Sequence, residues 1–521
     1  MVWLDAAILA RKLEYMSETG LQACVDKMTD AGVGASAIAS FTRQYGKLAS
    51  GATGLIPEAS IEPLLDVPAF DVTAAVPADA AEAMRHLVVI KLNGGLGTSM
   101  GMTGPKSLLP VRDGRTFLDL IVAQVIAARR QWGVGLPLLL MDSFATDAAT
   151  TAALEPYPDL PMPGLPLTFV QSREPKLLVD TLQPAEWPSE PALEWCPPGH
   201  GDIYGTLHDD GLLDSLIDAG YWYAFVSNAD NLGAEPSAGL AGWFANSGAP
   251  YAAEVCRRTV NDKKGGHLAR RRSDGRLILR DTAQTAPDEM DFFTDEHRHP
   301  FFHSNNLWWD LRVVRQLLTD GQFDLPLIRN VKTVDPTDRT TPAVIQIETA
   351  MGTAIELFEG AQAIEVPRNR FVPVKKTNEL LLLRSDVYTI STAGELSAQT
   401  PAIPLVDLGP AYQFVDNFDA RVPYAPSLKA ATSLVVQGDW TFGRDVTVLG
   451  DVHLDDDGQV HTVPDGAVLR GAAHNAQEFA AMQQAAAGLG LDAAPLLRNP
   501  GPLTDADRRL IAEVPPHHGR V

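Results

Sequence analysis

One glycine-rich segment, LVVIKLNGGLGTSMGMTGPKS at residues 87–107, constrains this chain more than any other stretch. Its apolar start, Leu87–Ile90, predicts a strand, and a helical pattern follows from about Thr116. Glycine permits positive φ angles and close backbone approach, so a strand, a glycine loop and a helix in this order bring N–H groups close to a phosphate chain. Lys106 adds a mobile positive charge for the same phosphates. The segment is a candidate nucleotide-phosphate loop.

Two widespread phosphate-binding patterns do not fit this loop. The Walker A pattern requires Gly-Lys-Ser/Thr, whereas here Gly104 is followed by Pro105. The dinucleotide pattern G-x-G-x-x-G matches Gly95 and Gly97, but Met100 occupies the third glycine position. The loop therefore belongs to another class of nucleotide-binding protein.

The composition limits the kinds of partner. The chain has 521 residues, a length that predicts two or three domains. Its net charge of -23 argues against nucleic acid as a partner, because phosphate backbones require a basic surface. An acidic protein that handles a nucleotide must concentrate positive charge locally, which draws attention to the lysines inside motifs.

The cysteines and the N-terminus indicate the compartment. Cys24, Cys196 and Cys256 form no CxxC pair, so we expect neither a disulfide framework nor a cysteine zinc site. The first residues, MVWLDAAILARKLEYM, carry four charges and lack the apolar core of a signal peptide. No run approaches ~20 apolar residues. We expect a cytoplasmic protein with no membrane partner.

Changes in composition and hydrophobic pattern along the sequence predict four segments. Residues 1–85 are expected to form a helical arm and a Pro- and Ala-rich connector. Residues 86–405 alternate between apolar runs and helical stretches, which indicates an α/β domain with a mostly parallel sheet. Residues 406–475 contain short β-branched pairs at roughly six-residue steps, a spacing typical of a small β-helix. Residues 476–521 form a tail.

Within the α/β segment, polar residues follow predicted strands. The predicted strands span 136–141, 167–171 and 222–226, and the predicted helices span 116–132, 211–219, 310–318 and 343–358. Ligands of open α/β sheets bind outside the carboxyl ends of strands. Gln171, Asn228 and Asp230 come at those ends and are candidate ligand-binding residues.

A histidine cluster offers a weaker signal. His297, His299 and His303 suggest a zinc site, but their spacing is loose and Pro300 interrupts them. We expect no zinc here.

The glycine loop also carries a family resemblance. LNGGLGTSMGMTGPKS resembles the signature of the eukaryotic-type UTP–glucose-1-phosphate uridylyltransferases, also called UDP-glucose pyrophosphorylases. Further motifs similar to that family's follow in the expected order, and the resemblance extends from about residue 56 to 471. They are FVQSREPKL (169–177), PPGHGD (197–202), SNADNLG (227–233), KGG (264–266), HSNNLW (303–308), QIETAM (346–351) and RFVPVKKT (370–377).

The resemblance implies a fold and a reaction. The fold would be a Rossmann-like, GT-A-like nucleotide-diphospho-sugar transferase domain with a mixed α/β sheet, followed by a left-handed β-helix. The substrates would be UTP and glucose 1-phosphate, and the products UDP-glucose and pyrophosphate. Such a transfer requires alignment of two polyanions and screening of their charge rather than a protein nucleophile. The implied cofactor is Mg²⁺, for which one carboxylate plus substrate phosphates is sufficient.

The resemblance also assigns roles residue by residue. The implied catalytic residues are Lys106, Lys375 and Asp230, with Asp230 also the metal ligand. The implied nucleotide-binding residues are Leu92, Asn93, Gly94, Gly95, Gly97, Lys106, Gln171, Gly199, His200, Asn228 and Asp230. The implied sugar-phosphate-binding residues are His200, Asn228, Lys264, Asn305, Asn306, Glu348 and Lys375. His303 stands where many relatives have asparagine, which leaves its role open.

Two alternatives and one assembly question stay open. The same chemistry could act on galactose 1-phosphate or N-acetylglucosamine 1-phosphate, although relatives using the latter carry a loop closer to AGGxGTRLG, unlike Asn93 and residues 98–100 here. A non-catalytic nucleotide-binding scaffold is the alternative from another class. In relatives the β-helix mediates assembly, so a homo-oligomer through that segment is a further expectation.

Overall fold

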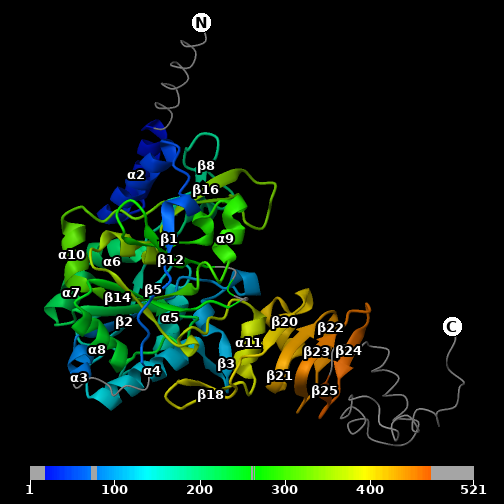
Figure 1. Cartoon of the computed structure of the whole chain (residues 1–521). Coiled ribbons are helices and arrows are strands. Elements are labelled where there is room, and N and C mark those ends of the chain that lie inside the picture. The colour runs from blue at the N-terminus through cyan, green and yellow to red at the C-terminus, as the bar shows by residue number, and fades with distance from the viewer. Residues whose placement is uncertain (1–17, 72–78, 260–261, 263–264, 471–521) are drawn as a thin grey trace, which may run out of the picture. The chain divides into compact units, whose positions relative to one another are not determined.

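A computed structural model describes residues 18–71, 79–259, 262 and 265–470. The chain divides into two compact units, each built from separate stretches of sequence (Figure 1). The first unit comprises Met1–Gly95, Gln124–Ala229 and Ala234–Phe371, and the second comprises Leu96–Ala123, Asp230–Gly233 and Val372–Val521. The glycine loop is thus shared, since its first part belongs to one unit and its second part to the other.

A seven-stranded mixed sheet forms the centre of the first unit. Four of its six strand pairings are parallel and two, those of β14, are antiparallel. The order is β17 (Gln362–Glu365), β11 (Tyr251–Arg257), β14 (Phe301–Asp310), β10 (Tyr223–Asn228), β2 (Leu87–Leu92), β5 (Leu138–Asp142) and β6 (Thr168–Val170). The four strands predicted from the sequence are confirmed as β2, β5, β6 and β10, and the expectation of a mostly parallel sheet holds for the pairings.

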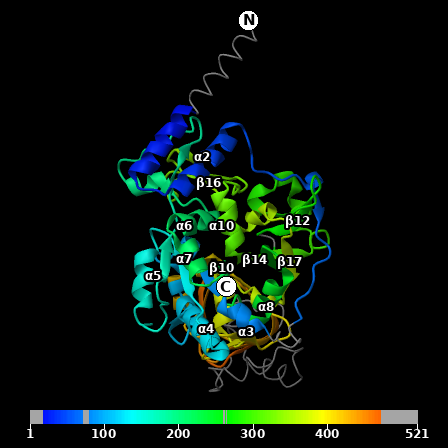
Figure 2. The same cartoon turned by 90° about the vertical axis from the view of Figure 1, so that its left-hand side faces the viewer.

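Helices cover both faces of this sheet, as Figure 2 shows. On one face, α6 (Ile203–Asp209), α7 (Leu212–Asp218) and α10 (Leu311–Thr319) pack in one buried cluster with Val88, Ile90 and Val226. On the other face, Phe244 of α8 (Ala238–Ser247) lies against Trp308, which stacks on Phe225. Alternate side chains of each strand therefore enter opposite layers, as a sheet buried on both faces requires.

The helices predicted at 116–132, 211–219 and 310–318 are confirmed as α4 (Phe117–Trp132), α7 and α10. The helix predicted at 343–358 is wrong. Ala343–Glu348 forms strand β16, which pairs with β15 (Ile328–Thr333), and Met351–Leu357 forms the 3₁₀ helix η8. Alanine, methionine and glutamate favour a helix, but Val344, Ile345 and Ile347 are buried in the strand, so tertiary pairing overrides local propensity.

Smaller elements complete the first unit. Residues 18–30 are helical, and α2 (Ala35–Ala49) buries Phe41 and Tyr45 against β16 and β8 (Leu177–Leu178). The earlier part of the predicted arm lies outside the described residues. A separate antiparallel sheet contains β1 (Ile61–Pro63), β12 (His267–Arg271) and β13 (Leu277–Arg280). A short antiparallel pair contains β7 (Glu174–Pro175) and β9 (Trp195–Cys196).

The second unit is dominated by parallel strands that coil. Register partners Ser427, Thr447 and Val468 are 20 and then 21 residues apart, so each coil takes about three six-residue steps. Its two sheets are β20 (Leu405–Leu408), β21 (Ser427–Val436), β23 (Thr447–Leu454) and β25 (Val468–Arg470), and β22 (Asp439–Phe442) and β24 (Val460–Val463). The predicted C-terminal repeat of parallel strands is confirmed, whereas the predicted tail lies outside the described residues.

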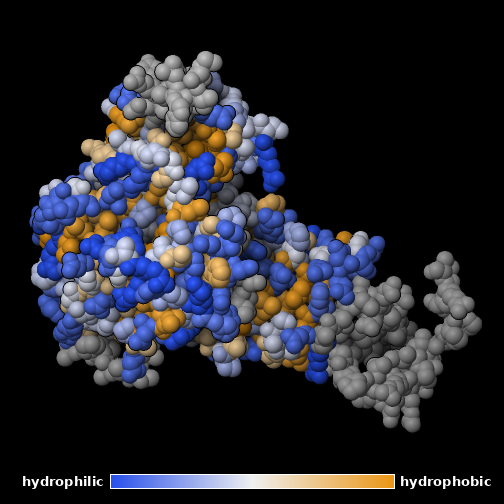
Figure 3. Space-filling view, turned by 45° about the horizontal axis from the view of Figure 1, so that its top comes forward, coloured by the Kyte–Doolittle hydropathy of each residue, from blue (hydrophilic) through white to orange (hydrophobic). Residues whose placement is uncertain are grey.

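The second unit also contains several short elements. They are β3 (Pro110–Arg112), β4 (Arg115–Thr116), α11 (Thr377–Arg384), β18 (Tyr388–Ile390), β19 (Leu396–Ala398) and α12 (Val415–Arg421). The Arg112 guanidinium donates to the carbonyls of Leu383, Ser385 and Tyr388, which ties β3 to the end of α11. Among the described helices of the whole chain, none is long and apolar enough to span a membrane. On the face drawn in Figure 3, hydrophobic residues form small groups among polar ones.

Candidate active site

The first part of the glycine loop is anchored by a buried amide. Asn93 is only 3% exposed, and its Nδ2 donates to Asp142 Oδ1 at 2.7 Å and to Thr150 Oγ1 at 2.9 Å. The backbone of Leu92 contributes as well, because its carbonyl accepts from Ala229 N–H at 3.0 Å. Asn93 therefore holds the loop onto β5 and α5 (Asp147–Leu154) instead of directing its amide at a ligand.

Gln171 lies against this loop. A Cβ at Gly94 would come within 3.0 Å of Gln171 Nε2, and Ser143 Oγ donates to the Gly94 carbonyl at 3.0 Å. The Gln171 backbone N–H donates to Asp142 O at 2.8 Å, which fixes the residue directly after β6. Gly95 has open space where a side chain would lie. The structure thus brings together Gly94 and Gln171, two residues that the sequence placed 77 positions apart.

Asp142 contacts both Asn93 and Gln171, but the sequence analysis did not identify it as a site residue. It is fully buried at the end of β5, and its Oδ1 accepts from Asn93, Thr146 and Thr150. Its Oδ2 has no partner in the described part of the chain. Burial raises the pKa of Asp142 to about 6, against the lowering effect of its three hydrogen bonds. An aspartate at the end of a buried strand, beside the loop, was the available signal.

Asp142→Asn is expected to stabilise the protein at pH 7.5 by about 1–3 kcal/mol, because the neutral amide keeps the accepting oxygen without the cost of a buried charge. The folded carboxyl binds its proton below about pH 6 and the unfolded one only near 3.8. The contribution of Asp142 to wild-type stability therefore rises as the pH falls through 6, and the advantage of the variant shrinks towards pH 5. Denaturant unfolding at both pH values tests this. Asp142→Ala, which removes one of the two acceptors of Asn93 Nδ2, should destabilise the protein. A loss of stability in Asp142→Asn at pH 7.5 would contradict the assignment.

The segments PPGHGD and QIETAM are joined by backbone hydrogen bonds. Thr349 N–H donates to Pro198 O and Gly201 N–H donates to Thr349 O, both at 2.9 Å. Gly199 has φ +79°, and a Cβ there would lie 2.4 Å from Thr349 O, so only glycine fits. Glu348, at the end of β16, lies beside this junction, with Lys332 Nζ 3.8 Å from its Oε1. Two motifs about 150 residues apart in the sequence therefore lie side by side and form one wall of the candidate site, made of PPGHGD and QIETAM.

Asp202 connects that wall to Gln171. Its buried carboxylate accepts from Ser172 N–H at 2.6 Å and from Thr206 Oγ1 at 2.8 Å. His200 lies at the start of the same turn, and its Nδ1 accepts from Met351 N–H at 2.9 Å. Burial lowers the pKa of His200. Asp202 is the last residue of PPGHGD, but the motif alone did not predict that its carboxylate would hold Ser172 and Thr206 in place.

Asn228 and Asn305 form a pair. Asn305 has φ +60°, which asparagine tolerates better than most residues, and it lies at a β-bulge where β14 slips its register against β11. Its Nδ2 donates to Asn228 Oδ1 at 3.0 Å. The neighbour Asn306 is fully buried and donates instead to Glu254 Oε2 at 2.9 Å. Of the two asparagines proposed for the sugar, the geometry favours Asn305.

Glu254 organises the buried side of the bulge and was also missed. It has no exposed surface, and four donors saturate its carboxylate at 2.8–3.0 Å. These are Asn306 Nδ2, Trp308 Nε1, and the Nε and Nη2 of Arg370. A buried charge is tolerated when it is paired in this way.

In the second unit, Lys106 and Asp230 form an ion pair at 2.7 Å. Both side chains are mostly buried, being 17% and 19% exposed. Gly97, with φ +63°, lies against the stem of Lys106, because a Cβ there would be 3.5 Å from Lys106 Cγ. The segment before Lys375 lies alongside, since Val374 N–H donates to the Asp230 carbonyl at 3.3 Å. The Lys375 side chain itself is exposed.

Asp230 has the features that a magnesium ligand needs. Its Oδ1 is buried and lacks a partner among the described residues, while Oδ2 carries the ion pair. No group of three or more His, Cys, Asp or Glu within the described ranges could hold a metal by itself. Magnesium bound through one carboxylate and substrate phosphates does not require such a group, so the open oxygen fits the expected ion.

Lys264 and two histidines of the predicted cluster are the remaining candidates. Lys264 lies outside the described residues. His299 Nε2 is 3.2 Å from Glu58 Oε1, and His303 is buried next to Gly352, whose Cβ would lie 2.8 Å from the His303 ring.

Comparison with known proteins agrees with these motifs. The family model described as UTP--glucose-1-phosphate uridylyltransferase matches residues 38–449. The chain belongs to this family. The family predicted from the motifs is thereby confirmed, and with it the activity, the nucleotidyl transfer for which the family is named.

Individual members are similar over most of their length. The UTP--glucose-1-phosphate uridylyltransferase of Hordeum vulgare is 39% identical over 406 residues, which is 76% of this chain and 84% of that protein. The enzyme of Saccharomyces cerevisiae is 39% identical over 391 residues, 74% of this chain and 77% of that one. A crystal structure of a mutant UDP-glucose pyrophosphorylase from Leishmania major with UDP-glucose matches with a TM-score of 0.83 and 40% identity, covering 88% of this chain and 99% of that one.

Proposed function

We propose that the chain transfers the uridylyl group of UTP to glucose 1-phosphate by in-line displacement with Mg²⁺. A phosphate oxygen of the sugar forms the new bond to the α-phosphorus of UTP. The bond from that phosphorus to the β-phosphate bridging oxygen breaks, and pyrophosphate leaves with the electron pair. The observation that carries the proposal is the Lys106–Asp230 pair, with its open carboxylate oxygen, on the glycine loop of a family member.

The residues of the second unit would handle charge. Asp230 Oδ1 would hold Mg²⁺, which when bound supplies neutralisation of phosphate charge. Lys106 would bind the triphosphate, and its present partner Asp230 keeps its ammonium group directed at that position. Lys375, exposed on a segment hydrogen-bonded to Asp230, would stabilise the charge that develops during transfer.

The residues of the first unit would recognise uridine and sugar. Gln171 presents a donor and an acceptor on one amide, which suits the imide edge of uracil. The Gly94 and Gly95 backbone and the turn at Gly199 and His200 would line the nucleoside. Asn228 and Asn305, joined to each other, and Glu348 would contact sugar hydroxyls.

Three finer features belong to the same proposal. The parallel coils of the second unit support a left-handed β-helix, and this surface is our candidate for a homo-oligomer contact. The four sequential segments predicted above remain our division of the chain. The three cysteines are all buried free thiols, which supports a reducing, cytoplasmic location.

Pyrophosphate release from UTP tests the reaction and its sugar. We expect release with Mg²⁺ and glucose 1-phosphate, none after chelation by EDTA, and recovery when Mg²⁺ is added back. Galactose 1-phosphate and N-acetylglucosamine 1-phosphate serve as matched co-substrates and should give much slower release. Equal or faster release with either sugar would overturn the glucose assignment, and no release with any of them would overturn the proposal.

A further inference from the structure

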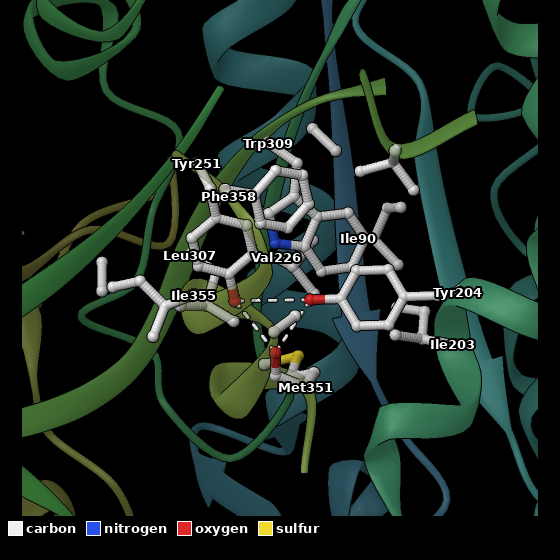
Figure 4. Close-up of a cluster of buried hydrophobic side chains, with 14 of the residues drawn as sticks. Ile90, Ile203, Tyr204, Val226, Tyr251, Leu307, Trp309, Met351, Ile355 and Phe358 are labelled. Carbon is white, nitrogen blue, oxygen red and sulfur yellow. Dashed lines mark hydrogen bonds between the residues drawn. The ribbon is translucent and has the colours of Figure 1, made fainter. Parts of the chain in front are cut away.

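The backbone of Met351 connects a candidate site residue to two buried tyrosines. Its N–H donates to His200 Nδ1 at 2.9 Å. Its carbonyl accepts from Tyr204 Oη at 2.8 Å and from Tyr251 Oη at 2.9 Å, as Figure 4 shows. Met351 begins η8, Tyr204 lies on α6 and Tyr251 on β11, so three elements meet at this one residue.

This contact determines the protonation of His200. A backbone N–H can only donate, so Nδ1 must be the unprotonated, accepting nitrogen, and the neutral ring carries its proton on Nε2. Burial lowers the pKa of His200, while the Asp281 carboxylate acts in the opposite direction. The other ionisable neighbour is His303, whose pKa burial lowers to about 3, so it stays neutral. Nε2–H has no acceptor among the described residues and is available to a ligand.

Both tyrosines are core residues, and their hydroxyl oxygens lie 3.3 Å apart. They are 1% and 0% exposed, and burial raises the pKa of both, so each keeps its proton and donates it to the Met351 carbonyl. A carbonyl oxygen has two lone pairs, and the two hydroxyls fill both. The ring bodies pack among Ile90, Val226 and Trp309, while their hydroxyls converge from different elements on one backbone oxygen.

We propose that Tyr204 and Tyr251 are positioning residues for uridylyl transfer. They clamp the Met351 backbone so that its N–H keeps His200 neutral, with an Nε2–H donor facing an oxygen of the sugar nucleotide. The proposal rests on the nucleotide-binding role proposed for His200. It adds a device that no motif contains: tyrosine hydroxyls fix a backbone residue, which in turn fixes a histidine tautomer.

Tyrosine-to-phenylalanine variants at 204 and 251, singly and together, test the clamp. Each single variant leaves one hydroxyl on the carbonyl, so we expect little change, whereas the double variant should raise KM for UDP-glucose about tenfold with a smaller change in kcat. Its activity should also fall between pH 7.5 and 6, because His200 without its donor protonates more readily. Tyr45→Phe is the matched control, because Tyr45 is equally buried and donates to Leu182 O at 3.1 Å in a separate cluster. This variant should lose stability while its KM and pH profile stay those of the wild type.

Histidine ¹⁵N NMR gives a readout that does not depend on turnover. The His200 signal, assigned with His200→Gln, should show the Nε2-protonated pattern in the wild type and change in the double variant. An Nδ1-protonated wild-type ring would overturn the proposal even if the double variant failed to fold. So would a double variant with the pH profile and KM of Tyr45→Phe. If pyrophosphate release were absent in the wild type, the proposed function would fail, while the NMR result would still decide the clamp.

Discussion

Lys375→Ala is expected to lower kcat for uridylyl transfer by roughly 10²- to 10⁴-fold while leaving the fold intact. The side chain is exposed, and no hydrogen bond or ion pair joins its Nζ to a described residue, so truncation removes charge without removing packing. The backbone at this point is fixed independently, since Val374 N–H bonds to Asp230 O and Lys375 N–H to Glu379 Oε2. What is lost is a mobile cation on a segment tethered to the candidate metal ligand.

Lys376→Ala is the matched control for this variant. It removes the same charge from the next exposed residue, at the start of α11, and should retain most of the activity. Steady-state kinetics in both directions, with circular dichroism to confirm folding, separate the two variants. Equal losses in both would mean that net charge of the segment matters rather than one lysine, and full activity in Lys375→Ala would remove it from the mechanism.

The parts of the site that could be predicted are those encoded locally. A buried apolar run followed by glycines or by Asn and Asp indicates a strand end. Gly94, Gln171 and Asp230 come just after strands, and Asn228 is the last residue of β10, as the sequence indicated. Gly199 was predicted from its motif, and its φ of +79° with Thr349 in close contact supplies the physical reason for glycine there. These residues could be predicted because glycine and strand-end residues act through their own backbone, which depends on the local sequence.

The parts that could not be predicted depend on partners far along the chain. Asn305 and Asn306 are adjacent residues of the same type. Only the register shift between β14 and β11 directs Asn305 towards Asn228 and Asn306 towards Glu254. Asp142 and Glu254 look like ordinary acidic residues until their donors are known. The helix predicted at 343–358 failed for the same reason, because pairing with β15 is not written in local propensity.

A further consequence of burial concerns acid stability. In four histidines, three of them buried, the pKa is lowered, mainly by loss of hydration, so the folded protein keeps them neutral. They are His200, His267, His299 and His303. His267 stacks on His299 at 3.8 Å between ring centroids, with Arg258 and Arg280 opposing protonation of both and Glu58 favouring it at His299. The ordinary pKa of histidine is near 6.5.

The unfolded chain therefore binds protons at these histidines below about pH 6.5 and the folded chain does not, so stability falls as the pH decreases from 7.5 to 5.5. Three buried carboxyls act in the opposite sense, because burial raises their pKa and the folded state retains their protons: Asp142, Glu174 and Asp202. We expect the histidines, whose ordinary pKa lies inside this pH range, to outweigh the carboxyls, so that unfolding takes up protons on balance. Denaturant unfolding across this range measures the resulting loss of stability.

His303→Asn tests the assignment at a single residue. The pKa of His303 is lowered to about 3, so the whole uptake at this position occurs in the unfolded chain, and the variant should reduce the pH slope by about half a proton at pH 6.5 and about one proton, ~1.4 kcal/mol per pH unit, at pH 5.5. Comparison at pH 8, where histidine carries no proton in either state, isolates any loss of packing around Gly352. An unchanged slope would mean that His303 is already protonated in the folded protein. A stability that rose towards pH 5.5 would show instead that the carboxyls outweigh the histidines.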